Sequence, residues 1–364
     1  MGMTHMNDLN SFYKGKRVLL TGHTGFKGSW LTIYLKKLGA EVFGYALDPG
    51  TPKDNFVLAG LSDKMTDIRG NLLDRAALHR AFEIAKPDLV FHLAAQPLVR
   101  LSYELPVETY AVNVMGSIHV MEEFRRSDTA KAAVMITTDK CYENKETLTG
   151  YKETDPIGGY DPYSSSKAAC EIAISSWRRS FLNPVDYVKH GKAIASARAG
   201  NVIGGGDWAK DRIIPDCIRA LEANRPIIVR NPGAVRPWQH VLEPLRGYLM
   251  LGQALYQDPV KFAEGWNFGP EHDSVLTVKE VVELLISEFG YGEMTTPVQE
   301  TPQPHEANLL TLDIAKAKTV LGWSPVLNAK GCLHLTAEWY KKFHGMSAYD
   351  LCLEQIAKFE GKDN

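Results

Sequence analysis

The sequence predicts an α/β fold, in which helices cover both faces of a doubly wound parallel sheet and a smaller C-terminal α+β part follows. Two observations support this prediction: short apolar strand-like runs alternate with helical stretches, and a glycine-rich turn joins the first strand to the next helix. Alternation at this spacing is typical of parallel strands joined by crossover helices. The expected strands are 17–20, 41–45, 88–93, 132–137 and 193–197, and the expected helices are 29–38, 75–85, 107–124 and 163–181.

The pattern changes after about residue 201, where three consecutive glycines and several prolines punctuate shorter elements. Further helices are expected at 278–289, 313–321 and 333–343. We therefore expect one domain over 1–200, with a return segment near 236–268, and a second domain over 201–364. A chain of 364 residues is long enough for two such units.

Composition and charge exclude several classes of protein. The chain is 45% hydrophobic and 23% charged, with 41 basic and 43 acidic residues, so disorder and bulk affinity for nucleic acid are not expected. No apolar run reaches membrane-spanning length. Five widely spaced cysteines without a Cys-x-x-Cys motif argue against a metal site or a disulfide framework. Because the N-terminus lacks an apolar signal region, we expect a cytoplasmic protein with no membrane partner.

The turn over 21–28 reads Thr-Gly-His-Thr-Gly-Phe-Lys-Gly, with the pattern G-x-x-G-x-x-G between strand and helix. Glycines let the backbone approach a pyrophosphate, and the helix N-terminus supplies free N–H groups, as in Rossmann-type dinucleotide sites. We expect this site to include Gly22, Thr24, Gly25, Phe26 and Gly28. Asp48 follows the last of these by 20 residues, where an acidic side chain would grip the adenosine ribose and favour NAD. The alternative is an ordinary Asp-Pro turn residue.

Tyr163 and Lys167 are spaced i,i+4, so both side chains lie on one face of the expected helix. A nearby ammonium stabilises phenolate, and such a tyrosine can take a proton from a sugar hydroxyl while hydride leaves the same carbon. Thr138, Asp139 and Lys140 follow the end of a strand, where ligands bind in doubly wound sheets. Thr138 could hydrogen-bond the reacting oxygen, with Asp139 and Lys140 as an acid/base pair. The alternative is a solvated pair at a strand end.

Together these motifs resemble the extended short-chain dehydrogenase/reductase superfamily over nearly the whole chain. The resemblance rests on 21–28, 91–95, 113–117, 163–167 and 321–325. Thr138-Asp139 resembles the nucleotide-sugar 4,6-dehydratases rather than the epimerases. The segments 21–30, 137–142, 198–208 and 236–240 are similar to the branch of that family that acts on CDP-glucose.

The resemblance implies an NAD-dependent reaction at the sugar. Tyr163, helped by Lys167 and Thr138, would remove the C4 hydroxyl proton during oxidation, and Asp139 would protonate the departing C6 hydroxyl. Many relatives carry Glu in place of Lys140 and use it as the base at C5. A lysine is protonated at neutral pH unless burial or neighbouring cations favour its neutral form. Lys140 is therefore either the C5 base, which we favour, or a charged stabiliser of the enolate, with the base elsewhere, for example Tyr142 or Glu143.

The resemblance also implies further contacts, a fold assignment and an assembly. Residues 1–200 would bind NAD and 201–364 mainly the nucleotide sugar. The expected cofactor contacts are Asn71, Leu72, Ala94, Ala95 and Gln96. The expected substrate contacts are Asn201, Arg212, Arg236, His305 and Glu306. Relatives pair through two long helices, which implies a homodimer or a dimer of dimers, and the family implies a role in bacterial dideoxyhexose and O-antigen synthesis.

Three other functions compete with this interpretation. An inverting UDP-N-acetylglucosamine 4,6-dehydratase also carries Thr, Asp and Lys, but its glycine turn and C-terminal half look less like this chain. A nucleotide-sugar C4 epimerase needs no acid/base pair beside Thr138. A non-catalytic NAD(H)-binding regulator would not require both Tyr163 and Lys167.

Overall fold

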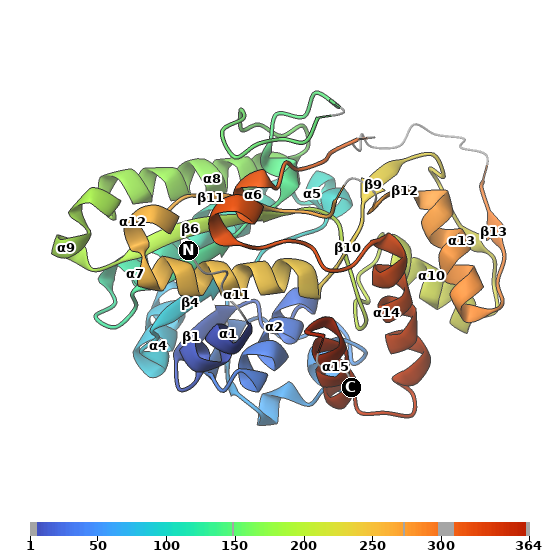
Figure 1. Cartoon of the computed structure of the whole chain (residues 1–364), viewed down its shortest axis with the longest axis horizontal. Coiled ribbons are helices and arrows are strands. Elements are labelled where there is room, and N and C mark those ends of the chain that lie inside the picture. The colour runs from blue at the N-terminus through green and yellow to red at the C-terminus, as the bar shows by residue number, and fades with distance from the viewer. Residues whose placement is uncertain (1–5, 148, 272–273, 298–308, 362–364) are drawn as a thin grey trace.

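The structure is a computed structural model that describes residues 6–147, 149–271, 274–297 and 309–361. A seven-stranded sheet with the order β11-β6-β5-β4-β1-β2-β3 forms its centre (Figure 1). All its neighbouring strands run parallel, so the predicted doubly wound parallel sheet is confirmed. The strands are β1 (Arg17–Thr21), β2 (Glu41–Ala46), β3 (Thr66–Arg69), β4 (Leu89–His92), β5 (Ala132–Ile136), β6 (Ala193–Ala199) and β11 (Gly265–Phe268).

Helices cover both faces of the sheet, which explains why its central strands are mostly apolar. Side chains alternate along β1, so that Val18 and Leu20 pack into one core and Leu19 into the other. The first core includes residues of α1 (Met6–Tyr13), α2 (Phe26–Lys37) and α11 (Leu242–Gln257). The second core includes residues of α4 (Arg75–Ala85), α7 (Ser117–Arg126) and α8 (Pro162–Ser180).

Several elements differ from the prediction. The expected helix 107–124 consists of α6 (Pro106–Tyr110), a π-helical segment (Ala111–Gly116) and α7. The sequence analysis missed β3, β11, α1, α11 and the C-terminal helix α15 (Ala348–Phe359). β3 lies at the sheet edge and its Thr-Asp-Ile-Arg sequence has no buried residue, so it lacks the apolar run that marks the other strands.

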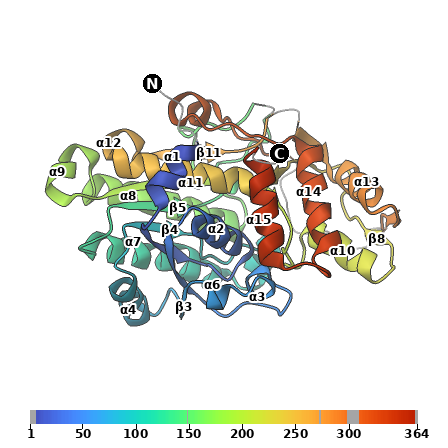
Figure 2. The same cartoon turned by 60° about the horizontal axis from the view of Figure 1, so that its bottom comes forward.

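The C-terminal half contributes helices and three two-stranded ladders beside the sheet (Figures 1 and 2). The predicted helix 278–289 is confirmed as α13 (Val278–Phe289), which begins with a capping box between Thr277 and Glu280. The expected helix 313–321 is reduced to a short π-helical segment (Ala317–Leu321), and the expected helix 333–343 begins earlier, as α14 (Ala329–Lys342). The ladders pair β7 (Val202–Ile203) with β10 (Gln239–His240), β9 (Val235–Pro237) with β12 (Val275–Thr277), and β8 (Ile227–Ile228) with β13 (Met294–Thr295).

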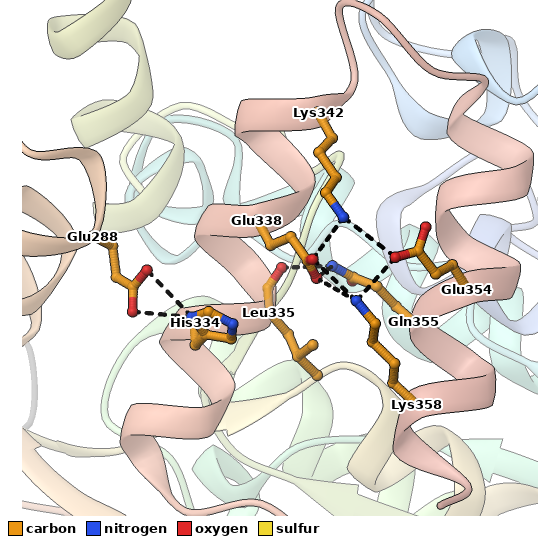
Figure 3. A network of polar contacts seen from close by, with 8 residues as sticks. All are labelled: Glu288, His334, Leu335, Glu338, Lys342, Glu354, Gln355 and Lys358. Carbon is orange, nitrogen blue, oxygen red and sulfur yellow. Dashed lines mark hydrogen bonds and ion pairs between the residues drawn. The ribbon is translucent and has the colours of Figure 1, made fainter. Parts of the chain in front are cut away.

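Helix α15 connects the C-terminal half to the first part of the sheet. Glu338 of α14 lies between Lys342 and Lys358, and both lysines also reach Glu354 of α15 (Figure 3). On its other side α15 packs against α2, where Lys37 Nζ lies 2.6 Å from Glu360 Oε2. The C-terminal helix therefore braces the helix that follows the glycine turn. None of the described helices has the length and apolar character needed to cross a membrane.

Candidate active site

A cleft of about 2170 Å³ opens at the carboxyl ends of β1, β4, β5 and β6. The strand order reverses between β1 and β4, and ligands bind at such a switch point in doubly wound sheets. All five predicted catalytic residues line this cleft: Thr138, Asp139, Lys140, Tyr163 and Lys167. The predicted cofactor and substrate residues in its walls are Gly22, Thr24, Gly25, Phe26, Gly28, Asn71, Leu72, Ala94, Ala95, Asn201, Arg212 and Arg236.

The glycine turn fits a dinucleotide diphosphate. Gly22 has φ +78°, and a Cβ atom there would lie 2.6 Å from the backbone nitrogen of Ala94. A Cβ atom on Gly28 would lie 2.1 Å from the carbonyl oxygen of Gly22. Gly25 is exposed to the cleft and caps α2 without a side-chain hydrogen bond, so the first N–H groups of this helix are available to an anion.

Two predicted cofactor residues lie outside the cleft lining. Asp48 has a side chain that is 89% exposed, and its nearest recorded partner is Arg69, at 3.8 Å. The Gln96 side chain turns back into its own loop, where its amide donates to the carbonyl of Leu98 and the hydroxyl of Thr109. The Gln96 side chain therefore stabilises the loop after β4 and does not line the cleft.

Asn71 and Leu72 line the cleft and are held by hydrogen bonds within the protein. The Asn71 side-chain oxygen accepts from the backbone of Leu73, and its carbonyl accepts from the Tyr45 hydroxyl at 2.8 Å. Leu72 is buried, and its carbonyl is held by His119 at 2.9 Å. This segment is thus fixed by its own hydrogen bonds rather than by a carboxylate.

Tyr163 and Lys167 both lie in α8 and are both buried. Asp161 caps this helix through the backbone of Ser164, which places Tyr163 in the first turn at the cleft wall. Burial raises the pKa of Tyr163 to about 12, although a hydrogen bond with Thr138 opposes this rise. Burial lowers the pKa of Lys167, whose ammonium lies 3.4 Å from the carbonyl of Ile136. The protein without ligands therefore keeps the phenol protonated.

Asp139 and Lys140 lie in a short 3-10 turn (Asp139–Cys141) shortly after β5, and Thr138 caps this turn by accepting from the backbone of Lys140. The Thr138 hydroxyl donates to Asp139 Oδ1 at 2.9 Å, and Lys140 Nζ lies 3.9 Å from the same oxygen. Gly200, after β6, leaves room for the carboxylate, because a Cβ atom there would lie 2.7 Å from Asp139 Oδ2. The arrangement places a buried carboxyl group and a partly exposed amine side by side in the cleft.

Tyr142 is not placed to act as a base, although it borders the cleft. Its hydroxyl donates to Asn267 at 2.7 Å and accepts from Arg198 at 2.7 Å, and its ring stacks on Tyr151. Burial raises its pKa. Glu143, the other alternative, is exposed and lines the cleft.

Three of the predicted substrate-binding residues lie in the described part of the chain: Asn201, Arg212 and Arg236. Arg212 precedes α10 (Ile213–Glu222), and Asp207 accepts from its guanidinium at 2.9 Å and raises its pKa. Asn201 follows β6, and Arg236 lies in β9. His305 and Glu306 lie outside the described residues.

The sequence analysis missed Lys27, which lines the same cleft. The residue was quoted within the glycine turn but given no role. A role in anion binding could have been predicted for it, because it is a positively charged residue at the second position of a helix that begins at a phosphate-binding turn. Among the described residues there is no group of three or more His, Cys, Asp or Glu placed to hold a metal ion.

The geometry is that of a nucleotide-sugar enzyme of the dehydrogenase type, and comparison with known proteins identifies the family. The sequence profile described as GDP-mannose 4,6 dehydratase matches residues 19–335, and the chain belongs to this family. It is 50% identical over 331 residues to CDP-glucose 4,6-dehydratase of Salmonella typhimurium, covering 91% of this chain and 92% of that protein. The chain is thus a homologue of that dehydratase.

More distant proteins share the fold. The dTDP-glucose 4,6-dehydratase of Neisseria gonorrhoeae is 28% identical, over 89% of this chain and 95% of that protein. Among solved structures, UDP-glucose 4-epimerase of Thermotoga maritima superimposes with a TM-score of 0.74 at 23% identity, covering 89% of this chain and 98% of that one. The dTDP-glucose 4,6-dehydratase of Bacillus anthracis, in complex with NAD, has a TM-score of 0.71 at 20% identity, covering 89% and 96%.

Proposed function

We propose that this protein converts CDP-D-glucose to CDP-4-dehydro-6-deoxy-D-glucose and water, with NAD as a recycled cofactor. The observation that carries the proposal is one cleft that contains Tyr163, Lys167 and the Thr138-Asp139-Lys140 turn, in a chain 50% identical to a CDP-glucose 4,6-dehydratase. A phenol, a carboxyl group and an amine can supply the proton transfers of an oxidation followed by an elimination.

The chain's residues divide the proton transfers between them. NAD, bound over the glycine turn, would supply the hydride acceptor and donor. Tyr163 takes the proton of the C4 hydroxyl, with Thr138 hydrogen-bonded to its phenol. Lys167 favours the phenolate by its charge. Asp139 donates a proton to the leaving C6 hydroxyl, and burial of its carboxyl keeps bulk water from competing.

Lys140 is our proposed base at C5. It lines the cleft, its ammonium lies 3.9 Å from Asp139 Oδ1, and its side chain is partly exposed. Tyr142 is a poor alternative because its hydroxyl is already paired with Asn267 and Arg198. A base and an acid on neighbouring residues suit an elimination across adjacent carbon atoms.

Mass spectrometry of separate incubations with CDP-, UDP- and dTDP-glucose tests the proposal. Purified protein with NAD should remove one water from CDP-glucose and accumulate no net NADH. Turnover of UDP-glucose or dTDP-glucose in preference to CDP-glucose would contradict the nucleotide assignment. Formation of an isomer with unchanged mass would indicate epimerisation instead.

We also propose that the protein is a homodimer or a dimer of dimers in the cytoplasm. Exposed apolar side chains on the α6–α7 segment and on α8 support pairing through these helices: Val107, Tyr110, Met115 and Ile172. The product is a 4-keto-6-deoxy sugar nucleotide, a precursor suited to dideoxyhexose and O-antigen synthesis. Sedimentation of wild type against Val107→Glu tests the pairing, because a buried charge should shift the protein toward monomer.

A further inference from the structure

Lys27 is a cleft residue to which the proposed reaction assigns no role. It occupies the second position of α2, directly after the glycine turn, and it lines the cleft together with the catalytic residues. Its side chain is only partly exposed. No recorded hydrogen bond or ion pair joins its ammonium to any of the described residues, whereas Lys37 at the other end of the helix is paired with Glu360.

Positive charges outnumber negative ones around Lys27. The charged groups that act on it all line the cleft: Arg212, Asp139, Lys167 and Lys140. Burial, and then repulsion by Arg212, lower the pKa of Lys27 to about 8, and Asp139 offsets this only in part. The carboxylate that faces Arg212, Asp207, already pairs with that arginine.

A lysine in a site with little access to water is normally paired, because an unpaired charge there is costly. The position of Lys27 in the first turn of α2 adds the positive end of a helix dipole to the same place. A site that collects a lysine, an arginine and a helix N-terminus is complementary to a phosphate group.

We propose that Lys27 and Arg212, which line the same cleft, together bind a diphosphate group. This inference rests on the proposed function, which supplies two such groups: the diphosphate of the sugar nucleotide and that of the dinucleotide cofactor. Arg212 provides planar, fixed donors, and Lys27 provides a point charge beside the glycine turn. Lys27 is thus a ligand-binding residue added to the turn.

Anion binding by Lys27 should be coupled to the uptake of protons. A bound diphosphate favours the ammonium form and raises the pKa of Lys27, so binding near pH 8 takes up protons from the solvent. Affinity should therefore fall as the pH rises above about 8, because free Lys27 then loses its charge. A structural lysine remote from the ligand would produce neither effect.

Isothermal titration calorimetry with Lys27→Met and Lys27→Arg tests this proposal. NAD is titrated into NAD-free protein, and CDP into NAD-loaded protein, at pH 8 in two buffers with different ionisation enthalpies. We expect Lys27→Met to weaken one of the two ligands by about tenfold or more and to abolish its proton uptake. Lys27→Arg should restore most of the affinity, because it keeps the charge. The matched control is Lys36→Met, a change on the same helix away from the cleft.

The two titrations identify the source of the diphosphate. Loss of NAD affinity assigns Lys27 to the cofactor, and loss of CDP affinity assigns it to the substrate. Unchanged affinity and proton uptake for both ligands in a folded Lys27→Met protein would overturn the proposal. If wild type binds these ligands but does not dehydrate CDP-glucose, the proposed function fails while the effect of Lys27 remains measurable with NAD.

Discussion

Glu171 of α8 and Arg198 of β6 form a buried ion pair, with 2.8 Å between Oε2 and Nη2. Glu171 also accepts hydrogen bonds from Thr137 and Ser196. Burial alone would raise the pKa of Glu171, but Arg198 and these hydrogen bonds outweigh it and hold the pKa below its ordinary value. The pair ties the helix that carries Tyr163 to β6, and the hydrogen bond from Thr137 ties the same glutamate to the segment that precedes Thr138. Glu171 therefore positions the two halves of the acid/base set.

Replacing Glu171 with Gln should destabilise the protein by about 3–5 kcal/mol, because Arg198 then remains buried without a counter-charge. Urea denaturation at pH 7 measures the change. Glu122→Gln, which breaks the partly exposed pair with Arg125, is the control and should cost no more than ~1 kcal/mol. Equal losses of unfolding free energy in the two variants would show that the buried pair contributes no more to stability than the partly exposed pair.

Tyr163→Phe should slow C4 oxidation by about 10²–10⁴-fold, because it removes the group that accepts the hydroxyl proton. Binding of CDP-glucose should change little, since the ring remains. Single-turnover formation of NADH, followed by absorbance, measures this step. Because burial raises the pKa of Tyr163 to about 12, the wild-type rate should increase from pH 6 to pH 8 as phenolate becomes more accessible. Full activity of the phenylalanine variant would exclude Tyr163 as the base.

Lys140→Met should block exchange of the C5 hydrogen with solvent deuterium while leaving some C4 oxidation. The reason is that Lys140 is our proposed base for the second step only. Tyr142→Phe is the matched variant, and it should keep the exchange because the Tyr142 hydroxyl is buried against Asn267 and Arg198. Exchange that persists in Lys140→Met and disappears in Tyr142→Phe would reverse the assignment.

Two buried histidines should make the fold sensitive to mild acid. Burial lowers the pKa of His92 and of His240 to about 3. An unfolded histidine has a pKa near ~6.5. Between these values only the unfolded chain takes up the proton, so stability is complete above pH ~6.5 and falls as the pH decreases, by about 1.4 kcal/mol per pH unit for each histidine.

Urea denaturation at pH 7 and pH 5 measures this loss. His240→Asn should make the decrease shallower, because it removes one of the two buried imidazoles. An identical pH dependence in wild type and in His240→Asn would contradict the role of burial.

The sheet could be predicted from the sequence because its central strands are short apolar runs between helical segments. β3 could not, since an edge strand with half-exposed residues carries no such run. β11 was not predicted because it joins the sheet from the second half of the chain, and only its tertiary pairing with β6 places it there. The π-helical segment 111–116 continues a helical pattern, so spacing alone did not reveal it.

For the site, the prediction combined residues from separate motifs. The glycine turn, the Thr138 turn and Tyr163 each end or begin an element at the same edge of the sheet, and this edge becomes the cleft. Lys27 was missed because its proposed role in anion binding depends on the nearby charges of Arg212 and Lys140, and only the fold brings these residues near it. The exposed position of Asp48 depends on loop conformation, which residue spacing does not specify.

The most direct test of the central claim follows a single hydrogen through the reaction. CDP-glucose labelled with deuterium at C4 is incubated with the protein and NAD, and the product is analysed by mass spectrometry and NMR. We predict loss of one water and deuterium at C6, because the hydride removed from C4 is returned within the same cleft. Product without deuterium at C6, or substrate of unchanged mass, would contradict the account.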